Sequence, residues 1–172
     1  MSRRIEAPMK LRRVGDSSSG LLCTAAQVLR SGLNECELCR GSSGVRVADS
    51  PRWRVVRVDD ASFPATYRVI WNAHVAEFSD LSPDERAECM EVVVRVERVL
   101  REQLHPTKVN LASLGNMVPY LHWHVIARFD WDSHFPQAVW AAAARTVEPP
   151  ALARLAVPLE RLDLAVRAAL NA

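Results

Sequence analysis

The chain lacks the features that mark several large classes of protein. None of its 172 residues belongs to an apolar run close to the ~20 residues that a membrane-spanning helix needs. It also lacks a run of basic residues interleaved with aromatic ones, and its net charge is only +2. We therefore expect neither a membrane nor a nucleic acid as its partner.

Cysteine is scarce, but two of the cysteines are close together. Cys36 and Cys39 form the sequence CELC, whereas Cys23 and Cys89 stand alone. The apolar stretch GLLCTAAQVL near the start is short and contains Gln27, so we expect no signal peptide. In a protein that is not exported, a CxxC pair indicates metal binding or redox chemistry, and a reducing cytoplasm is the expected location.

The remaining composition, 49% apolar and 24% charged, is typical of a globular protein. The pattern predicts strands at 52–58, 65–72, 108–114 and 116–129. A helix is predicted over 83–104, because Ser82, Pro83 and Glu85 form a capping box with proline at the first helical position. An apolar stripe predicts a terminal helix, through Leu159, Leu162, Val166 and Leu170. This order of elements indicates an α+β fold, with a helix packed on a mostly antiparallel sheet.

The segment NMVPYLHWHVIARF, residues 116–129, contains the residues most relevant to function. In a strand, successive side chains point to opposite faces. One face of the segment would therefore carry Tyr120, His122, His124, Ile126 and Arg128, and the other Leu121, Trp123, Val125 and Ala127. The second face is apolar and is expected to lie in the core. The first presents two imidazoles roughly 6–7 Å apart along the strand.

Two imidazoles on one face permit several interpretations. One histidine can act as a nucleophile near neutral pH while the other orients it or protonates a leaving group. The pair can instead be partly buried and hydrogen-bonded, with a purely structural role. A metal site is less well supported, since no glutamate follows His124 closely and the chain is short for a barrel metallohydrolase.

With these residues in view, the chain resembles the histidine triad (HIT) family. Its signature, His-φ-His-φ-His-φ-φ with φ apolar, is matched by YLHWHVI (120–126) except at the first position. ATYRVIWNAH, LSPDERA and NLASLGN also resemble family segments. The resemblance implies a HIT-like antiparallel sheet with a long packed helix, plus a C-terminal helix, and a symmetric homodimer. The implied organisation is a partly flexible extension over 1–32, a HIT-like domain over 33–140 and a helical extension over 141–172.

The resemblance also implies an activity. Family members hydrolyse or transfer nucleotidyl groups at the α-phosphate of phosphoanhydrides or phosphoramidates, among them dinucleoside polyphosphates. By this resemblance His122 is the nucleophile that forms a nucleotidyl-histidine intermediate, and His124 contacts the phosphate or the leaving group. The implied nucleotide-binding residues are Asp59 (with Asp60 as its alternative), Asn110, Gly115, Asn116, His122 and His124. The rival interpretation is a non-catalytic nucleotide-binding or interaction protein that keeps the fold.

Tyr120 raises a question about metal binding. In zinc-containing bacterial relatives, the ligands are a CxxC pair, a histidine after an early strand and the first histidine of the triad. Cys36, Cys39 and His74 match the first three, and Tyr120 occupies the fourth position. The resemblance thus implies a structural zinc held by Cys36, Cys39 and His74, with Tyr120 as an uncertain fourth ligand. Tyr120 can also fill the space of the imidazole and hydrogen-bond to His122 or to a backbone group.

Overall fold

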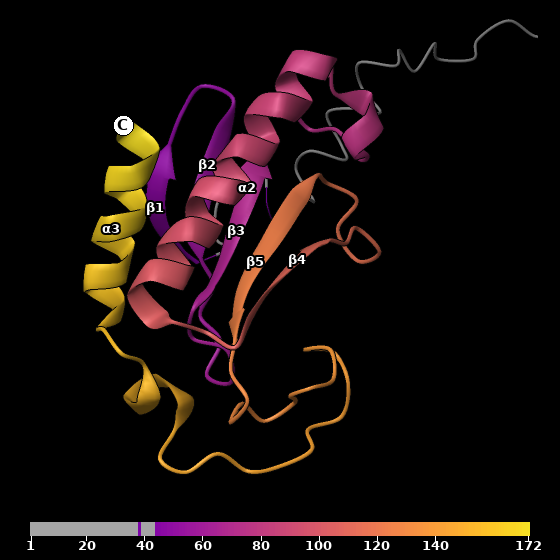
Figure 1. Cartoon of the computed structure of the whole chain (residues 1–172). Helices are drawn as coiled ribbons and strands as arrows, with labels where there is room; N and C mark the ends of the chain where they lie inside the picture. The colour runs from indigo at the N-terminus through magenta and orange to yellow at the C-terminus, as the bar shows by residue number, and fades with distance from the viewer. Residues whose placement is uncertain (1–37, 39–43) are drawn as a thin grey trace, which may run out of the picture.

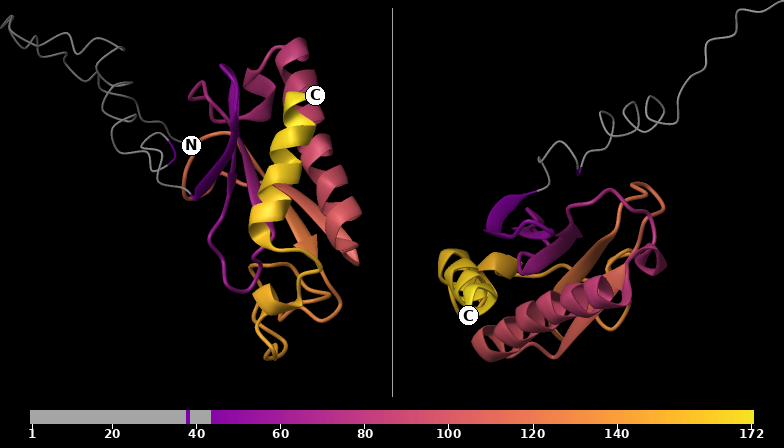
Figure 2. Two further views of the ribbon diagram at one scale, coloured as in Figure 1. Left: turned by 90° about the vertical axis from the view of Figure 1, so that its left-hand side faces the viewer. Right: turned by 90° about the horizontal axis from the view of Figure 1, so that it is seen from above.

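The computed structural model describes residue 38 and residues 44–172. Five antiparallel strands form one sheet in the order β1-β2-β3-β5-β4. Their bounds are β1 Val45–Asp49, β2 Trp53–Arg57, β3 Thr66–Trp71, β4 Lys108–Ser113 and β5 His122–Arg128. The helices α2 (Pro83–Leu104) and α3 (Leu159–Asn171) lie side by side on one face of this sheet (Figures 1 and 2).

The long helix α2 begins and ends where its sequence indicates. The Ser82 hydroxyl accepts a hydrogen bond from the backbone N–H of Glu85, and the Glu85 carboxylate accepts one from the N–H of Ser82. His105, in the left-handed conformation with φ 48°, ends the helix. One stripe of α2 packs on the sheet, through Cys89, Val92, Val93, Val96, Val99, Leu100 and Leu104.

The terminal helix α3 packs against α2 and β1. Its apolar residues Leu162, Val166 and Leu170 are buried in the same core as those of α2. Asp163 adds polar contacts, because its carboxylate accepts hydrogen bonds from the Arg57 guanidinium at 3.0 Å and from the Tyr67 hydroxyl at 2.7 Å. The stripe on this helix is thus covered within the chain and does not by itself call for a second subunit.

The structure confirms the α+β fold and corrects three details. β1 was not predicted, so the sheet has five strands rather than four. The last strand spans only His122–Arg128, because residues 114–121 form an irregular loop before it. Arg128 is not exposed beside the histidines. It is 2% exposed, and its guanidinium donates to the carboxylate of Asp132 at 2.7 Å.

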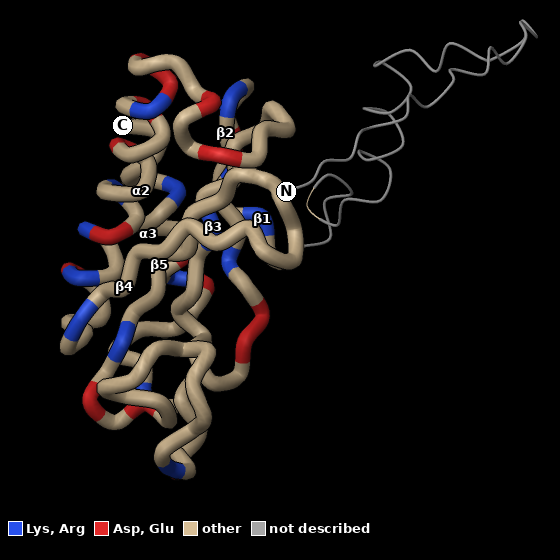
Figure 3. The backbone as a smooth tube through the Cα atoms, turned by 90° about the vertical axis from the view of Figure 1, so that its right-hand side faces the viewer, with Lys and Arg blue, Asp and Glu red and all other residues tan. Residues whose placement is uncertain are grey.

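Positive and negative residues are interspersed along the helical layer (Figure 3). Of the helices that the structure describes, none combines the length and the apolar character needed to cross a membrane.

Candidate functional site

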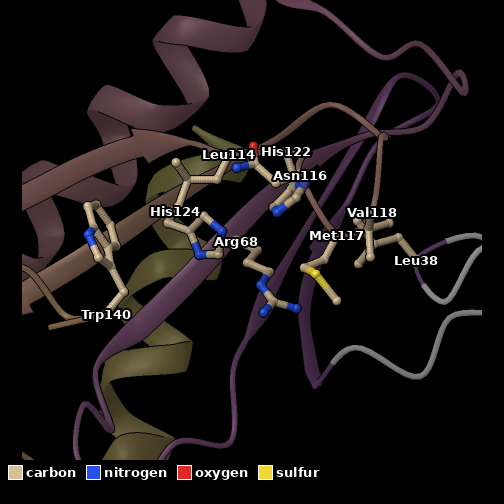
Figure 4. A pocket seen from close by; sticks show the side chains of 10 residues that line it. Leu38, Arg68, Leu114, Asn116, Met117, Val118, His122, His124 and Trp140 are labelled. Atoms are coloured by element: carbon tan, nitrogen blue, oxygen red, sulfur yellow. The ribbon is translucent and has the colours of Figure 1, made fainter. Parts of the chain in front are cut away.

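The face of the sheet away from the helices contains a cavity of about 620 Å³. The alternation of side chains along β5 brings His122 and His124 to this face, while Val125 and Ala127 enter the core. Arg68 reaches the cavity from β3, and the loop after β4 forms another wall (Figure 4). The described lining residues are Leu38, Arg68, Leu114, Gly115, Asn116, Met117, Val118, His122, His124 and Trp140.

The ring of His122 is held by a backbone group. Its Nδ1 lies 2.6 Å from the carbonyl oxygen of Tyr120, which can only accept a hydrogen bond. Nδ1 must therefore carry the proton, and Nε2 has the free lone pair. The backbone of His122 is fixed as well, because the Ser113 hydroxyl donates to its carbonyl at 3.0 Å. The imidazole is thus oriented, in the tautomer that a nucleophile requires.

The second imidazole lies against the first. The ring centroids of His122 and His124 are 4.8 Å apart, with the planes at 63°. Burial lowers the pKa of His122, and the nearby charge of Arg68 lowers it further against the opposing effect of the Tyr120 carbonyl. Burial, then His122 and then Arg68 lower the pKa of His124 to about 4. Both rings are consequently neutral near pH 7.

Gly115 and Asn116, which the resemblance assigns to nucleotide binding, belong to the irregular loop between β4 and β5. Gly115 and Asn116 both line the cavity, and Asn116 is exposed to solvent. Met117, in the same loop, is 93% exposed. The loop can therefore offer backbone and amide donors to a ligand in front of the histidines.

Asn110 lies nearby but outside this cavity. It lines a neighbouring one of about 410 Å³, and Trp140 borders both. The side-chain oxygen of Asn110 accepts a hydrogen bond from the Arg128 guanidinium at 2.8 Å. The side-chain amide nitrogen of Asn110 is not used in this bond and can donate to another group.

The acidic residues predicted to bind ribose do not line the cavity. Asp59 is exposed. The Asp60 carboxylate accepts hydrogen bonds from the backbone N–H groups of Ser62 and Phe63, at 2.8 and 3.1 Å. Asp60 thus stabilises the turn between β2 and β3.

The proposed metal ligands are only partly within the described residues. Cys36 and Cys39 lie outside them, whereas His74 is described and exposed. The hydroxyl of Tyr120, which is 2% exposed, donates to the carbonyl of Asn72 at 2.8 Å, and its ring lies 4.6 Å from that of His74. A phenol that donates its proton to a carbonyl does not fit the fourth position of a zinc site. Within the described ranges, no three His, Cys, Asp or Glu residues form a group that could hold a metal.

Arg68 and Trp140 are among the cavity residues that were not predicted from the sequence. Alternation along β3 puts Arg68 on the same strand face as Thr66 and Ile70. Together with the pairing of β3 with β5, which the sequence does not give, this places Arg68 beside the histidines. Trp140 follows β5 in an irregular segment, and no periodic signal marks it.

Comparisons with known proteins identify the family and the fold. The family model described as HIT domain matches residues 42–131. A histidine triad protein from Bradyrhizobium japonicum is 29% identical, with a TM-score of 0.60 over 73% of this chain and 90% of that one. A second, from Sinorhizobium meliloti, is 22% identical, with a TM-score of 0.59 over 81% and 98%.

A zinc-bound histidine triad family protein from Mycobacterium smegmatis is 21% identical, with a TM-score of 0.53 over 81% of this chain and 95% of that one. No curated protein matches the sequence.

Proposed function

We propose, from the premise that this chain belongs to the HIT domain family, that it is a nucleotidyl hydrolase or transferase. Its substrate is a nucleotide joined at the α-phosphate to a second group by a phosphoanhydride or phosphoramidate bond. The observation that carries the proposal is the orientation of His122, whose Nδ1 bonds to the Tyr120 carbonyl at 2.6 Å and leaves Nε2 as the nucleophile. A neutral imidazole is the reactive form, and the lowered pKa of His122 maintains it.

The proposed reaction has two displacement steps. His122 Nε2 forms a bond to the α-phosphorus, and the bond to the leaving group breaks with its electron pair. Water then attacks the same phosphorus, which releases a nucleoside monophosphate and regenerates the imidazole. His124, whose ring centroid lies 4.8 Å from that of His122, is the proposed contact for the leaving group or the phosphate oxygens.

The protein's contribution is mainly to hold the phosphate oxygens with oriented donors. Gly115 and Asn116 line the cavity and are the proposed donors. Asn110, in the adjoining cavity, is a proposed contact for the same nucleotide. Asp59 is proposed for the ribose hydroxyls, although it lies beyond the cavity, and Asp59→Asn should weaken nucleotide binding if it has this role.

The experiment compares one substitution at two histidines. His122→Asn should reduce turnover of an adenylyl substrate by about 10³-fold or more, since only binding and electrostatic effects remain. It should still bind AMP. His105→Asn is the matched control, because asparagine tolerates the left-handed conformation of that helix cap and the residue is remote from the cavity.

A second measurement tests the intermediate itself. Wild-type protein quenched during turnover should carry an acid-labile nucleotidyl mass on the peptide that contains His122. Undiminished activity in His122→Asn would exclude the mechanism.

A non-catalytic nucleotide-binding role is the second candidate. Tyr120 in place of the first triad histidine and the 93% exposed Met117 at the cavity both favour it. The wild-type protein would then bind AMP, but it would not turn over an AMP-linked fluorogenic substrate.

We also propose that Cys36, Cys39 and His74 bind a structural zinc ion. The CxxC pair and the zinc-bound relative support this, but the engaged hydroxyl of Tyr120 leaves the chain one ligand short of the usual four. The affinity should therefore be lower than that of a complete site. Elemental analysis of protein purified without chelators should find about one zinc per chain, and its absence would count against the site.

A symmetric homodimer is proposed from the family resemblance and from the open edge of the sheet. β4 is an edge strand that pairs only with β5 in the described chain, and Leu111 on it is 38% exposed. An edge strand offers unpaired backbone groups to a second copy. Light scattering at micromolar concentration should give a dimer mass, and a clean monomer mass would contradict the proposal.

A further inference from the structure

Arg68 brings a charge into the cavity from the strand beside the histidines. In the antiparallel pairing of β3 with β5, Arg68 lies directly opposite His124, and Ile70 lies opposite His122. Directly opposed residues have Cβ atoms about 4.5–5.5 Å apart. Arg68 lines the same cavity as both imidazoles, and Figure 4 shows its side chain between those of His124 and Met117.

The guanidinium of Arg68 is the main charge that a ligand in this cavity would meet. Of the described residues that line the cavity, Arg68 is the one with a permanent charge, and none is acidic. A guanidinium has several N–H donors in a planar fork that matches phosphate oxygens. It can therefore bind a phosphate group while it keeps contacts with the protein.

From this placement we infer that Arg68 is a specificity-determining residue, which binds the phosphate next to the scissile bond and makes the site selective for phosphoanhydrides over phosphoramidates. The inference rests on the proposed function and deepens it. The preferred substrates are those whose leaving group is an anionic phosphate.

The two kinds of leaving group differ in whether they must be protonated as the bond to phosphorus breaks. When the bond to a leaving phosphate breaks, its oxygen keeps the electron pair and departs as an anion, which Arg68 stabilises without any proton transfer. When a phosphorus–nitrogen bond breaks, the nitrogen takes the electron pair and must gain a proton. His124, with a pKa of about 4, is a poor source of that proton near pH 7. The cavity thus favours the anionic leaving group.

The test compares two substrates that share the adenylyl group. Diadenosine triphosphate has a phosphate leaving group, and adenosine 5′-phosphoramidate has an amine. Wild-type protein should have the higher kcat/KM for the triphosphate. Arg68→Met should lower that value by about 10- to 100-fold, the size expected for lost hydrogen bonds to a charged group, and change the phosphoramidate value less than about threefold. Arg68→Lys should restore part of the loss, because it returns the charge without the fork.

Controls separate this inference from the proposed mechanism. Arg98→Met, on the exposed side of α2, should change neither value. His122→Asn should abolish turnover of both substrates, whereas Arg68→Met should impair only one. Equal losses for both substrates in Arg68→Met, or no loss for either, would overturn the selectivity.

A binding measurement covers the case in which the wild-type protein is not an enzyme. Calorimetry should then show that Arg68→Met weakens the binding of inorganic pyrophosphate about tenfold or more but leaves adenosine binding unchanged. Unchanged pyrophosphate binding would overturn the assignment of Arg68. A thermal unfolding curve checks that each variant is folded, and Arg68→Lys replaces Arg68→Met if the latter is not.

Discussion

Breaking the buried ion pair between Arg128 and Asp132 should strongly destabilise the fold, because it leaves a buried charge uncompensated. Arg128 is 2% and Asp132 1% exposed. The Asp132 carboxylate accepts bonds from Arg128 at 2.7 and 3.1 Å, and from the backbone N–H groups of Phe129, His134 and Phe135 at 3.2, 2.9 and 2.7 Å. This one carboxylate therefore holds both the end of β5 and the loop that follows it.

Asp132→Asn keeps the shape but removes the charge. One oxygen can still accept from the backbone of His134 and Phe135. The new amide group, however, places donors opposite the Arg128 guanidinium and leaves that cation uncompensated. Removing one partner of a buried pair costs about 3–5 kcal/mol, a large part of the roughly 5–15 kcal/mol that stabilises a typical domain. The melting temperature should fall by roughly 6–20 °C, at about 2–4 °C per kcal/mol for a protein of this size.

Urea unfolding followed by tryptophan fluorescence measures the change directly. Asp130→Asn is the matched control: Asp130 is exposed and two residues away, so its effect should stay within about 0.5 kcal/mol. If the two variants differed by less than about 1 kcal/mol, the ion pair would not have the stabilising role assigned to it.

The pH dependence gives an independent check of the same pair. Burial favours the neutral acid, but the Arg128 side chain and the backbone donors outweigh it and hold the pKa of Asp132 below its usual value of 3.8. A carboxyl with a lowered folded-state pKa stabilises the fold above its unfolded pKa and loses that effect as the pH falls through the folded value. The difference between wild type and Asp132→Asn should accordingly narrow below about pH 4.

Three further predictions follow from the site and the sheet. The lowered pKa of His122 keeps the proposed nucleophile neutral, so the acid limb of kcat/KM should have its midpoint below pH 6.5, and a midpoint above 6.5 would contradict this. Gly44→Ala should destabilise the chain by about 1–3 kcal/mol in urea unfolding, because Gly44 has a φ of 133° and an added Cβ would press on the Arg57 carbonyl. Tyr120→His should raise zinc affinity in a competition titration, and an unchanged affinity would mean that position 120 does not face the metal.

Local signals predicted the helical layer well. The capping box marks the start of α2, and Pro106 marks its end. Both signals lie within a few residues of the helix itself. β1 was missed because VRVAD (45–49) is short, although its partner β2 is the next strand along the chain. It is held by pairing with β2 and by Arg167 of α3, which donates to the Val47 carbonyl at 2.7 Å. The contact with Arg167 is not visible in a window of a few residues.

At the site, Arg128 and Arg68 also show that sequence periodicity does not predict tertiary contacts. Alternation placed Arg128 on the face of the histidines, which is correct for the strand but gives no information on burial. Asp132, four residues later in a loop, determines that Arg128 is paired away from the cavity. Arg68 lines the cavity only because β3 pairs with β5 in a particular register. In both cases the outcome depends on a tertiary contact that periodicity does not encode.

Tyr120 shows why one departure from the family signature need not remove the chemistry. Its side chain replaces an imidazole, but the bond that orients His122 comes from its backbone carbonyl, which any residue would supply. The phenol is accommodated separately, through a hydrogen bond to Asn72 and packing against Val56 and Ile70. The side chain of residue 120 lies beside His74 of the proposed zinc site, whereas the tautomer of His122 depends on the backbone carbonyl of residue 120. Tyr120→His should consequently change metal affinity while it leaves the acid limb of kcat/KM where it was. A variant in which both moved together would mean that the side chain, not the carbonyl, controls the nucleophile.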